Sequence, residues 1–147
     1  MVLETNIDDM SAEIYSFLFG ELFAAGALDV FLTNIIMKKN RPGIKLNVLA
    51  KNEDLEVLEN IIFRETTTLG IRKYQVARKA LKRKFFDIQT EWGPVKIKAA
   101  YKDGELVSYN PEYEDCKTIA EKFELPLKKV YTKVKQLANN KLPPDNT

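Results

Sequence analysis

Residues 2–26 read VLETNIDDMSAEIYSFLFGELFAAG, and this stretch decides how the chain begins to fold. Residues 2–7 form a short apolar segment that predicts a β-strand. Ser11 is typical of a helix N-cap, and Gly26 is typical of a residue that ends a helix. We therefore predict a helix that begins at Ser11 and runs to about Ala25. The chain is therefore expected to open with a strand followed directly by a helix.

The segments that follow continue this alternation of strands and helices. We predict a strand at residues 28–37 and a half-buried strand at residues 44–51. A helix is expected at residues 52–65 and a basic strand at residues 71–81. The Arg-Pro-Gly sequence at residues 41–43 predicts the turn between the first two of these strands. Asn52 is a suitable helix cap, and three threonines followed by Gly70 are expected to end the second helix.

This order of elements predicts an α+β fold with a ferredoxin-like split βαβ core, βαββαβ. A β-hairpin with strands at residues 85–89 and 95–99 is expected to follow the core. Two C-terminal helices are expected after it, at residues 115–123 and 127–138. We expect residues 1–84 to form the ferredoxin-like core and residues 85–138 to form a hairpin and helical extension of the same domain. Residues 139–147 contain two prolines and few apolar side chains, which predicts a flexible tail.

Composition restricts the type of protein and the chemistry that is available to it. The chain has 147 residues, of which 30% are charged, and no apolar run approaches the length of a membrane span. Met1 stands directly before a strand, which predicts a start inside a longer protein, and the single Cys116 suits a cytoplasmic location. Histidine is absent, which excludes histidine acid–base catalysis and histidine-ligated zinc or nickel; a metal held here is expected to be a hard cation bound through oxygen.

The net charge of +2 hides a strong segregation of charge along the sequence. Residues 1–37 carry six acids and no lysine or arginine, whereas residues 38–51 carry five bases and no acid. Residues 64–84 carry eight bases against Glu65 alone. Such polarity suits an anionic ligand with a metal at one end, although solvated faces also produce charge runs.

Two adjacent carboxylates, Asp8 and Asp9, stand where the first strand ends and the first helix begins. Mg²⁺ and Mn²⁺ usually take one or two carboxylates and complete their coordination with phosphate oxygens and water. Glu13, about one turn further along, is in reach of such an ion through a water molecule. The alternative is that these acids only cap the helix, where negative charge is favoured in any case.

A compact cationic segment precedes the third strand and contains Lys38, Lys39 and Arg41, followed by Pro42 and Gly43. Glycine lets a backbone approach an anion closely, and arginine can bind two phosphate oxygens at once. This segment is therefore a candidate phosphate-binding turn. The alternative is a charged hairpin tip without a ligand.

A third candidate segment contains Arg64, then Thr66, Thr67 and Thr68, and finally Arg72. Its hydroxyls and amides suit a phosphate or a ribose, and they are equally suited to satisfying the last carbonyls of the second helix. Near the C-terminal helices, Cys116 follows several acids at a helix N-terminus. There it is either a thiolate with a lowered pKa that touches a soft metal or an inert packed side chain.

Two further patterns concern partners. Residues 118–135 have the spacing of a helix-turn-helix with a basic second helix, which would make a nucleic-acid-binding module; the alternative is a helix pair that closes onto a sheet. The first helix is apolar around more than half of its circumference. This predicts packing on two sides, against its own sheet and against a neighbouring subunit or domain.

Six segments together resemble the C-terminal domain of LarC, the nickel insertion protein family. They are ETNIDDMSAEIY (4–15), AGALDVF (25–31), MKKNRPG (37–43), IIFRETTTLGIR (61–72), PEYEDCKTIAE (111–121) and PLKKVY (126–131). The resemblance implies a CTP-dependent nickel chelatase, or cyclometallase, of the lyase class. Such a protein uses CTP with Mn²⁺ or Mg²⁺, gives CMP and pyrophosphate, and inserts Ni²⁺ into a pyridinium bisthiocarboxylate mononucleotide to make the nickel-pincer cofactor of lactate racemase.

The resemblance also implies partners and roles. It implies a homotrimer or a dimer of trimers and an N-terminal domain absent from this sequence, without which the reaction is incomplete; neither a membrane nor nucleic acid is an implied partner. On this basis Asp8, with Asp9 or Glu13, would hold the Mn²⁺ or Mg²⁺. The residues that would bind CTP are Lys38, Lys39, Arg41, Gly43, Arg64, Thr66, Thr67, Thr68 and Arg72. A carboxylate (Glu65, Glu112 or Glu114), a phosphate or water would remove the proton from the pyridinium ring. The alternatives are the nucleic-acid-binding module and a purely structural oligomerisation domain.

Overall fold

The computed structural model describes residues 1–139 and 141–143, and it divides into two compact units, Met1–Arg78 and Lys79–Thr147. The elements of the first unit are β1 (Val2–Ile7), α1 (Ala12–Ala24), β2 (Asp29–Met37), the 3-10 turn η1 (Lys38–Asn40), β3 (Arg41–Leu49), the 3-10 turn η2 (Asn52–Asp54), α2 (Leu55–Glu65) and β4 (Arg72–Tyr74). Those of the second unit are β5 (Lys82–Thr90), β6 (Gly93–Lys102), β7 (Glu105–Pro111), α3 (Tyr113–Lys122) and α4 (Leu127–Ala138).

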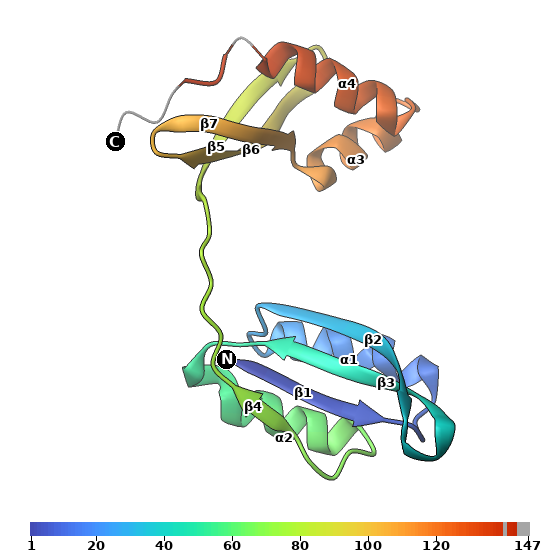
Figure 1. Cartoon of the computed structure of the whole chain (residues 1–147). Helices are drawn as coiled ribbons and strands as arrows, with labels where there is room; N and C mark the ends of the chain where they lie inside the picture. The colour runs from blue at the N-terminus through green and yellow to red at the C-terminus, as the bar shows by residue number, and fades with distance from the viewer. Residues whose placement is uncertain (140, 144–147) are drawn as a thin grey trace. The chain divides into compact units, whose positions relative to one another are not determined.

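The first unit is an antiparallel sheet with strand order β2-β3-β1-β4, and α1 and α2 cover one of its faces (Figure 1). This order arises because each helix returns the chain past one intervening strand, which is the split βαβ arrangement. The predicted α+β, ferredoxin-like core is confirmed. Side chains of β1 alternate between the buried helix side (Leu3, Thr5, Ile7) and a half-buried outer face.

The core of the first unit lies between its sheet and its two helices. Leu18 and Leu22 of α1 and Leu58 of α2 are fully buried against Leu3 and Leu46 of the central strands. Burying a leucine contributes about 1.5–3 kcal/mol, so contacts of this kind fix both helices on the sheet. The packed sheet and helices therefore form a rigid support for the polar loop after β1 and the polar turn between β2 and β3.

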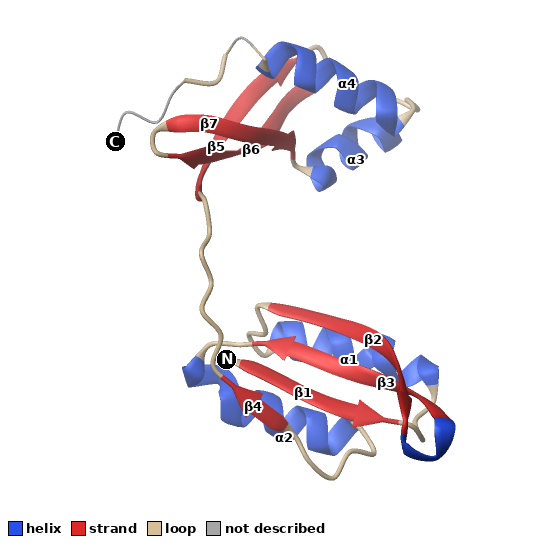
Figure 2. Ribbon diagram, in the orientation of Figure 1, coloured by secondary structure: helices blue, strands red, loops and turns tan. Residues whose placement is uncertain are grey.

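The second unit has its own sheet and its own core. Its strands are antiparallel in the order β5-β6-β7, and α3 and α4 pack on the sheet, as Figure 2 shows by colour. Val95 and Ile97 of β6 contact a cluster that includes Val130 and Val134 of α4. Trp92, in the turn between β5 and β6, is partly buried against the same cluster.

The fourth strand is much shorter than the sequence predicts. Instead of residues 71–81, only Arg72–Tyr74 pairs with the sheet. The ladder between β1 and β4 ends at the pair of Val2 and Tyr74, so the residues after Tyr74 have no strand beside them. Residues 75–81 are exposed and have no regular structure, so they form the connection to β5.

The turn between β2 and β3 lies a few residues earlier than predicted. Met37 pairs with Arg41, so the chain reverses over Lys38–Asn40 and Arg41 already belongs to β3. Lys39 and Asn40 have positive φ angles of 62° and 56°, which let the chain reverse in so few residues. Pro42 is tolerated in the strand because β1 ends opposite Ile44, which leaves one side of β3 without a neighbour at Pro42.

The second unit also differs from its prediction. The sequence predicts a two-stranded hairpin as an extension of the first domain, with a boundary after residue 84, whereas the chain divides at Arg78 and Lys79 and the hairpin gains a third strand, β7. Of the predicted tail at 139–147, residues 140 and 144–147 lie outside the described residues. Leu142 packs against the core of the second unit, and the carbonyl of Pro143 accepts a hydrogen bond of 2.9 Å from Tyr101.

The two separate cores lead to a prediction about proteolysis. Trypsin is expected to cut first at Arg78 or Lys79, because residues 75–81 are exposed and have no strand pairing. The two fragments should resist further digestion, since each keeps a complete core. Mass spectrometry of the digest and far-UV circular dichroism of the separated fragments check this. First cuts inside α2 or β6, or fragments without secondary structure, would contradict it.

Candidate functional site

Polar side chains meet at the corner of the first unit where β1 ends and β3 begins. Ile7 lies opposite Ile44 in the antiparallel register, so the chain that leaves β1 runs beside the start of β3. This brings Asp8 to Arg41, whose Nη1 donates to Oδ2 at 3.3 Å. The two residues are 33 positions apart in the sequence, and the sheet alone places them together. The end of the acidic segment and the basic segment therefore lie at one corner of the first unit.

The basic half of this site is highly accessible. Lys38 and Lys39 are exposed in the turn, and neither makes an ion pair with any residue that the structure describes. The Arg41 side chain is 61% exposed, and its contact with Asp8 leaves most of its five N–H donors available. Three cationic side chains at one hairpin end can therefore reach an anion without first breaking a buried contact.

The loop after α2 closes the acidic half of the site. Thr67 donates a short hydrogen bond from its hydroxyl to Oδ1 of Asp9. Thr68 exchanges a hydrogen bond of 2.5 Å with the hydroxyl of Thr5 in β1, which ties the loop to the sheet. Thr66 donates to the carbonyl of Ile62 at 2.7 Å and so satisfies the end of the helix. The three predicted threonines thus have different partners, and only Thr67 contacts the acidic pair.

The acidic pair has the chemistry of a hard-cation ligand but does not form a complete cage. Asp8 and Asp9 supply carboxylate oxygens, which suit Mg²⁺ or Mn²⁺. Glu13 is exposed in the first turn of α1. Within residues 1–139 and 141–143, no group of three or more acidic, cysteine or histidine side chains is arranged to hold a metal ion. A divalent cation fits here only as Mg²⁺ commonly binds, with one or two carboxylates and the remaining positions filled by a ligand and water.

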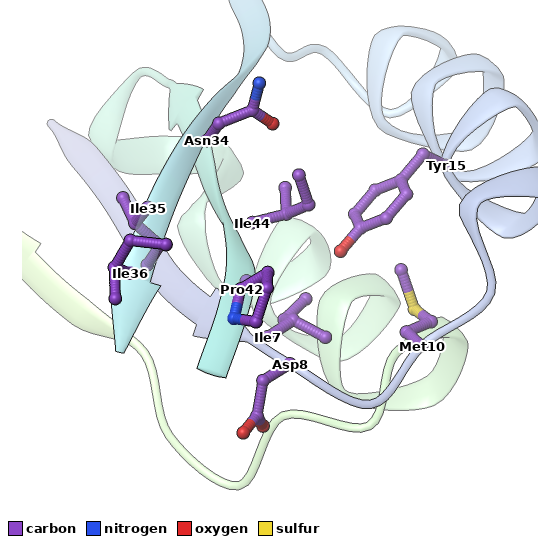
Figure 3. Close-up of a pocket in the computed structure, with 10 residues that line it drawn as sticks. Ile7, Asp8, Met10, Tyr15, Asn34, Ile35, Ile36, Pro42 and Ile44 are labelled. Atoms are coloured by element: carbon purple, nitrogen blue, oxygen red, sulfur yellow. The ribbon is translucent and has the colours of Figure 1, made fainter. Parts of the chain in front are cut away.

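A pocket of about 400 Å³ opens beside Asp8, between the start of α1, the last residues of β2 and the first residues of β3 (Figure 3). Its walls are mostly apolar and include Ile7, Met10, Ile36, Pro42 and Ile44. Tyr15 points its hydroxyl into the pocket from α1, and Asn34 lines it from β2.

Gly43 also lines this pocket, and its environment explains why glycine is needed there. A Cβ atom at this position would lie 2.7 Å from the Met37 sulfur and 3.0 Å from the carbonyl of Ile7. Gly43 therefore permits the close approach of the strands that form the corner. Its φ angle is not positive, and its role in the structure is packing.

Two of the predicted anion-binding arginines lie in other surroundings. Arg72 donates to Glu4 at 2.7 Å and to Asn6 at 2.6 Å on the outer face of the sheet, opposite the helices. Arg64 contacts Glu65 at 2.5 Å and Glu21 of α1 at 3.4 Å. Both arginines therefore already have carboxylate partners within the first unit.

The predicted proton acceptors are divided between the two units. Glu65 belongs to the first unit and is paired with Arg64. Glu112 belongs to the second and is paired with Lys98 at 2.8 Å. Glu114 is exposed, and its carboxylate makes no hydrogen bond or ion pair with the residues described. In the second unit Glu112 and Glu114 line a pocket of about 480 Å³ together with Phe85, Lys96, Lys98 and Asp115.

Cys116 is completely buried in the core of the second unit. Burial raises the pKa of its thiol, and the carboxylate of Asp115 raises it further. The alternative of a lowered pKa at the helix N-terminus is therefore wrong, and the thiol is a packed, neutral side chain.

The two C-terminal helices pack onto the sheet of the second unit. Ile119 of α3 and Val130 and Val134 of α4 are buried in its core. This is the arrangement of a helix pair that closes onto a sheet. Binding of nucleic acid by residues 118–135 stays a prediction.

Sequence reasoning missed the pocket and two of its polar residues, Tyr15 and Asn34. Tyr15 belongs to an apolar stripe of the first helix, and Asn34 interrupts an apolar strand. The one available signal was the amide side chain in the middle of an apolar run at residues 28–37. The pocket itself depends on how the start of α1 lies relative to β2 and β3, and the spacing of residues in the sequence does not reveal this arrangement.

The comparisons agree with this architecture. The sheet order and the polar corner define a ferredoxin-like protein that continues into a smaller α+β unit. The family model described as nickel insertion protein matches residues 1–131. The chain therefore belongs to the nickel insertion protein family. In the described residues, no helix is long and apolar enough to cross a membrane.

Individual relatives and solved structures match over most of the chain. A pyridinium-3,5-bisthiocarboxylic acid mononucleotide nickel insertion protein of Clostridium acetobutylicum is 51% identical over 133 residues, which are 90% of this chain and 32% of that protein. A putative nickel insertion protein of Dictyoglomus thermophilum is 53% identical over 137 residues, 93% of this chain and 35% of that one. The chain thus spans about a third of the length of these curated relatives.

Among solved structures, the apo form of LarC2 matches with a TM-score of 0.88 and 36% identity, over 95% of this chain and 96% of that one. It is described as the C-terminal domain of a cyclometallase involved in synthesis of the NPN cofactor of lactate racemase. A Methanopyrus kandleri protein matches with a TM-score of 0.68 and 24% identity, over 92% of this chain and 83% of that one, which shows the fold alone.

On the outer face of the first sheet, Glu4 contacts Arg72, Tyr74 and Lys45, and this cluster leads to a prediction about pH. The hydrogen bond from Arg72, helped by Tyr74 and Lys45, lowers the pKa of Glu4 despite its desolvation. Because the pKa of Glu4 is lower in the folded state, the ionised side chain stabilises the fold at pH values above the ordinary glutamate pKa of about 4.3. This stabilisation is lost as the pH falls through the pKa that Glu4 has in the folded protein. Glu4→Gln should lower the melting temperature at pH 7 by about 4–8 °C, the shift for a loss of about 1 kcal/mol.

Thermal melts between pH 7 and pH 3 test this prediction, and the difference between the two proteins should shrink toward pH 3. The matched control is Glu53→Gln, because Glu53 is largely exposed and pairs only with Lys51. A Glu4→Gln deficit that is the same at pH 3 and pH 7 would show that charge is not its cause.

Proposed function

We propose that the first unit is the metal–CTP-binding part of a nickel insertion enzyme. The observation that carries the proposal is the contact between Asp8 and Arg41, which joins a cation-binding carboxylate pair to an accessible cationic turn. A metal–nucleotide complex needs this combination, because the phosphates carry negative charge and the metal bridges them to carboxylates. Support also comes from relatives that are named as nickel insertion proteins.

In this proposal Asp8 and Asp9 hold Mn²⁺ or Mg²⁺, and Glu13 contributes through water. Bound metal would neutralise charge on the phosphates while water attacks the α-phosphorus and pyrophosphate leaves, which gives CMP and pyrophosphate. Thr67 keeps the Asp9 carboxylate in place through its hydrogen bond. Lys38, Lys39 and Arg41 bind the phosphate oxygens. Arg41 then exchanges its contact with Asp8 for one with phosphate, which frees Asp8 for the metal.

The remaining predicted phosphate ligands take a smaller part in the proposal. Thr66, Thr68 and Gly43 shape the loop and the strands around the site, and Arg64 and Arg72 would have to leave carboxylate partners to reach a nucleotide. We therefore place the phosphates at the turn over Lys38–Asn40 rather than at the two arginines.

The nickel ion is the substrate that this enzyme inserts into a pyridinium bisthiocarboxylate mononucleotide. Forming the nickel–carbon bond releases the ring proton, and a carboxylate can accept it. Glu114 suits this role better than Glu65 or Glu112, because each of those two is paired with a cation that stabilises its unprotonated form. Since the chain spans about a third of its relatives, we propose that the missing part supplies the nickel and completes the cytoplasmic reaction.

Assembly is part of the proposal. Ile14, Phe17 and Phe23 of α1 are between 37% and 58% exposed, although α1 already packs on the sheet through Leu18 and Leu22. Contiguous exposed apolar side chains commonly mark an interface between subunits. A homotrimer or a dimer of trimers would cover them, and light scattering measures this mass directly. A purely structural oligomer is the second candidate function, and it differs by showing no response to nucleotide.

Isothermal titration of CTP in the presence of Mn²⁺ tests the proposed site. Asp8→Ala and Arg41→Ala should each weaken binding by about 10- to 100-fold, which corresponds to the loss of one interaction with a charged group, about 1.5–3 kcal/mol. Lys51→Ala is the matched control, since Lys51 is an exposed cation of the same unit that contacts only Glu53. Unchanged affinity in both site variants would refute the assignment.

A further inference from the structure

The sheet of the second unit has a face that points away from its two helices. Along β6, buried apolar side chains alternate with Lys96 and Lys98, which therefore lie on the face opposite α3 and α4. Phe85 of β5 pairs with Lys98 in the antiparallel register, so it shares this face. The pocket of about 480 Å³ that Glu112 and Glu114 line opens here, beside these three residues.

Phe85 supplies an exposed aromatic ring to this pocket. It is 55% exposed, although phenylalanine is among the residue types most often buried. The Nζ atom of Lys98 lies 5.9 Å from the centroid of the ring, so the ring already attracts a positive charge. A flat cationic heterocycle stacked on Phe85 would gain the same attraction and would cover apolar surface that is now in contact with water.

The backbone of Lys96 holds the acidic wall of the pocket in place. Its N–H donates to Oδ2 of Asp115 at 2.8 Å, and its carbonyl accepts a hydrogen bond of 2.8 Å from the N–H of Glu112. These two hydrogen bonds join the start of α3 to β6. The segment that carries Glu112 and Glu114 is therefore fixed beside the pocket.

The charged side chains of the pocket leave binding capacity for a ligand. Lys98 gives one of its three N–H donors to Glu112 at 2.8 Å, which leaves two. The ammonium group of Lys96 and the carboxylate of Glu114 form no ion pair with any residue that the structure describes. One cavity thus combines an aromatic surface with a few polar groups that can orient a ligand, as small-molecule sites do.

The mononucleotide substrate of the proposed reaction complements these groups. A pyridinium-3,5-bisthiocarboxylic acid mononucleotide has a flat, positively charged ring and two thiocarboxylates, one on each side of a ring carbon. A pincer ligand binds its metal through two side groups and the carbon between them, so this carbon loses the ring proton. The ring suits Phe85, and the thiocarboxylate oxygens suit lysine ammonium groups.

We propose that this pocket is the subsite for the pyridinium ring of the mononucleotide substrate. The ring stacks on Phe85, and Lys96 and Lys98 bind the thiocarboxylate oxygens, so that the sulfur atoms stay free for nickel. Glu114 faces the ring carbon between them. The subsite rests on the proposed function, which supplies the substrate and the role of Glu114 as proton acceptor. It gives the substrate a site in the second unit, separate from the metal–CTP site of the first.

Titration calorimetry with pyridinium-3,5-dicarboxylic acid mononucleotide tests the subsite on the whole chain. This probe has oxygen in place of both sulfur atoms of the substrate. The titrations contain no divalent metal, so the metal–CTP site is not formed. Ribose 5-phosphate, which lacks the ring, and nicotinamide mononucleotide, whose ring carries an uncharged amide, are the comparison ligands.

Two variants should weaken binding of the dicarboxylate probe in different ways. Phe85→Leu is expected to weaken it by about 5- to 30-fold, the effect of losing the cation–π contact, and Phe85→Tyr should restore it. Lys96→Ala is expected to weaken it by about tenfold. The loss in Lys96→Ala should be much smaller for nicotinamide mononucleotide, which has no carboxylate on its ring.

Phe123→Leu and Lys122→Ala are the matched controls and should leave all affinities unchanged. Phe123 is an exposed phenylalanine of the same unit, and the Nζ atom of Lys122 lies 5.4 Å from its ring centroid. The pair thus repeats the contact between a lysine and an aromatic ring at a place outside the pocket. Far-UV circular dichroism and melting without ligand show whether each variant is folded.

The outcomes separate the ring subsite from the proposed function. Wild-type affinity for the dicarboxylate probe in both Phe85→Leu and Lys96→Ala overturns the ring subsite, and so does a wild-type protein that binds this probe no better than ribose 5-phosphate. The proposed function stands in either case if CTP binding with Mn²⁺ still depends on Asp8 and Arg41. If CTP binding does not depend on them while Phe85→Leu weakens the probe, the metal–CTP site fails and the ring subsite remains.

Discussion

The candidate site depends on one constraint, the antiparallel pairing of β3 with both β1 and β2. This pairing sets Ile7 opposite Ile44 and Met37 opposite Arg41, so the end of one strand and the turn between two others meet at one corner. A shift by one residue would turn every side chain of β3 to the other face of the sheet. The buried leucines and valines of the strands prevent such a shift, so the apolar core determines where the charges lie.

Much of this corner could be predicted from the sequence. Asp8 and Asp9 and the basic residues after Met37 stood out through charge segregation, and the order of strands and helices made their meeting plausible. The surroundings of Arg64 and Arg72 could not be predicted in full. Arg64 pairs with its neighbour Glu65 but also with Glu21 of α1, and Arg72 pairs with Glu4 of β1. The sequence shows where charged side chains occur along the chain, but only the tertiary structure shows which of them already form ion pairs.

The extent of the elements was harder to predict than their order. Residues 75–81 have the composition of a strand, yet the ladder between β1 and β4 ends at the pair of Val2 and Tyr74, and these residues pair with no strand. Strand formation requires a neighbour, and a local pattern cannot report whether one exists. For the same reason β7 (Glu105–Pro111) was missed, since its polar sequence becomes a strand only beside β6. The turn at Lys38–Asn40 was misplaced because glycine and proline usually mark turns, whereas here lysine and asparagine adopt the positive φ angles.

The position of Trp92 has a spectroscopic consequence. It is the only tryptophan of the chain, and it packs against the core of the second unit, whereas the polar corner and its pocket belong to the first. Tryptophan emission therefore follows the environment of one unit, while far-UV circular dichroism sums over the helices and strands of both. Two unfolding curves recorded on one sample with these two probes would coincide only if the units unfold as a single cooperative system.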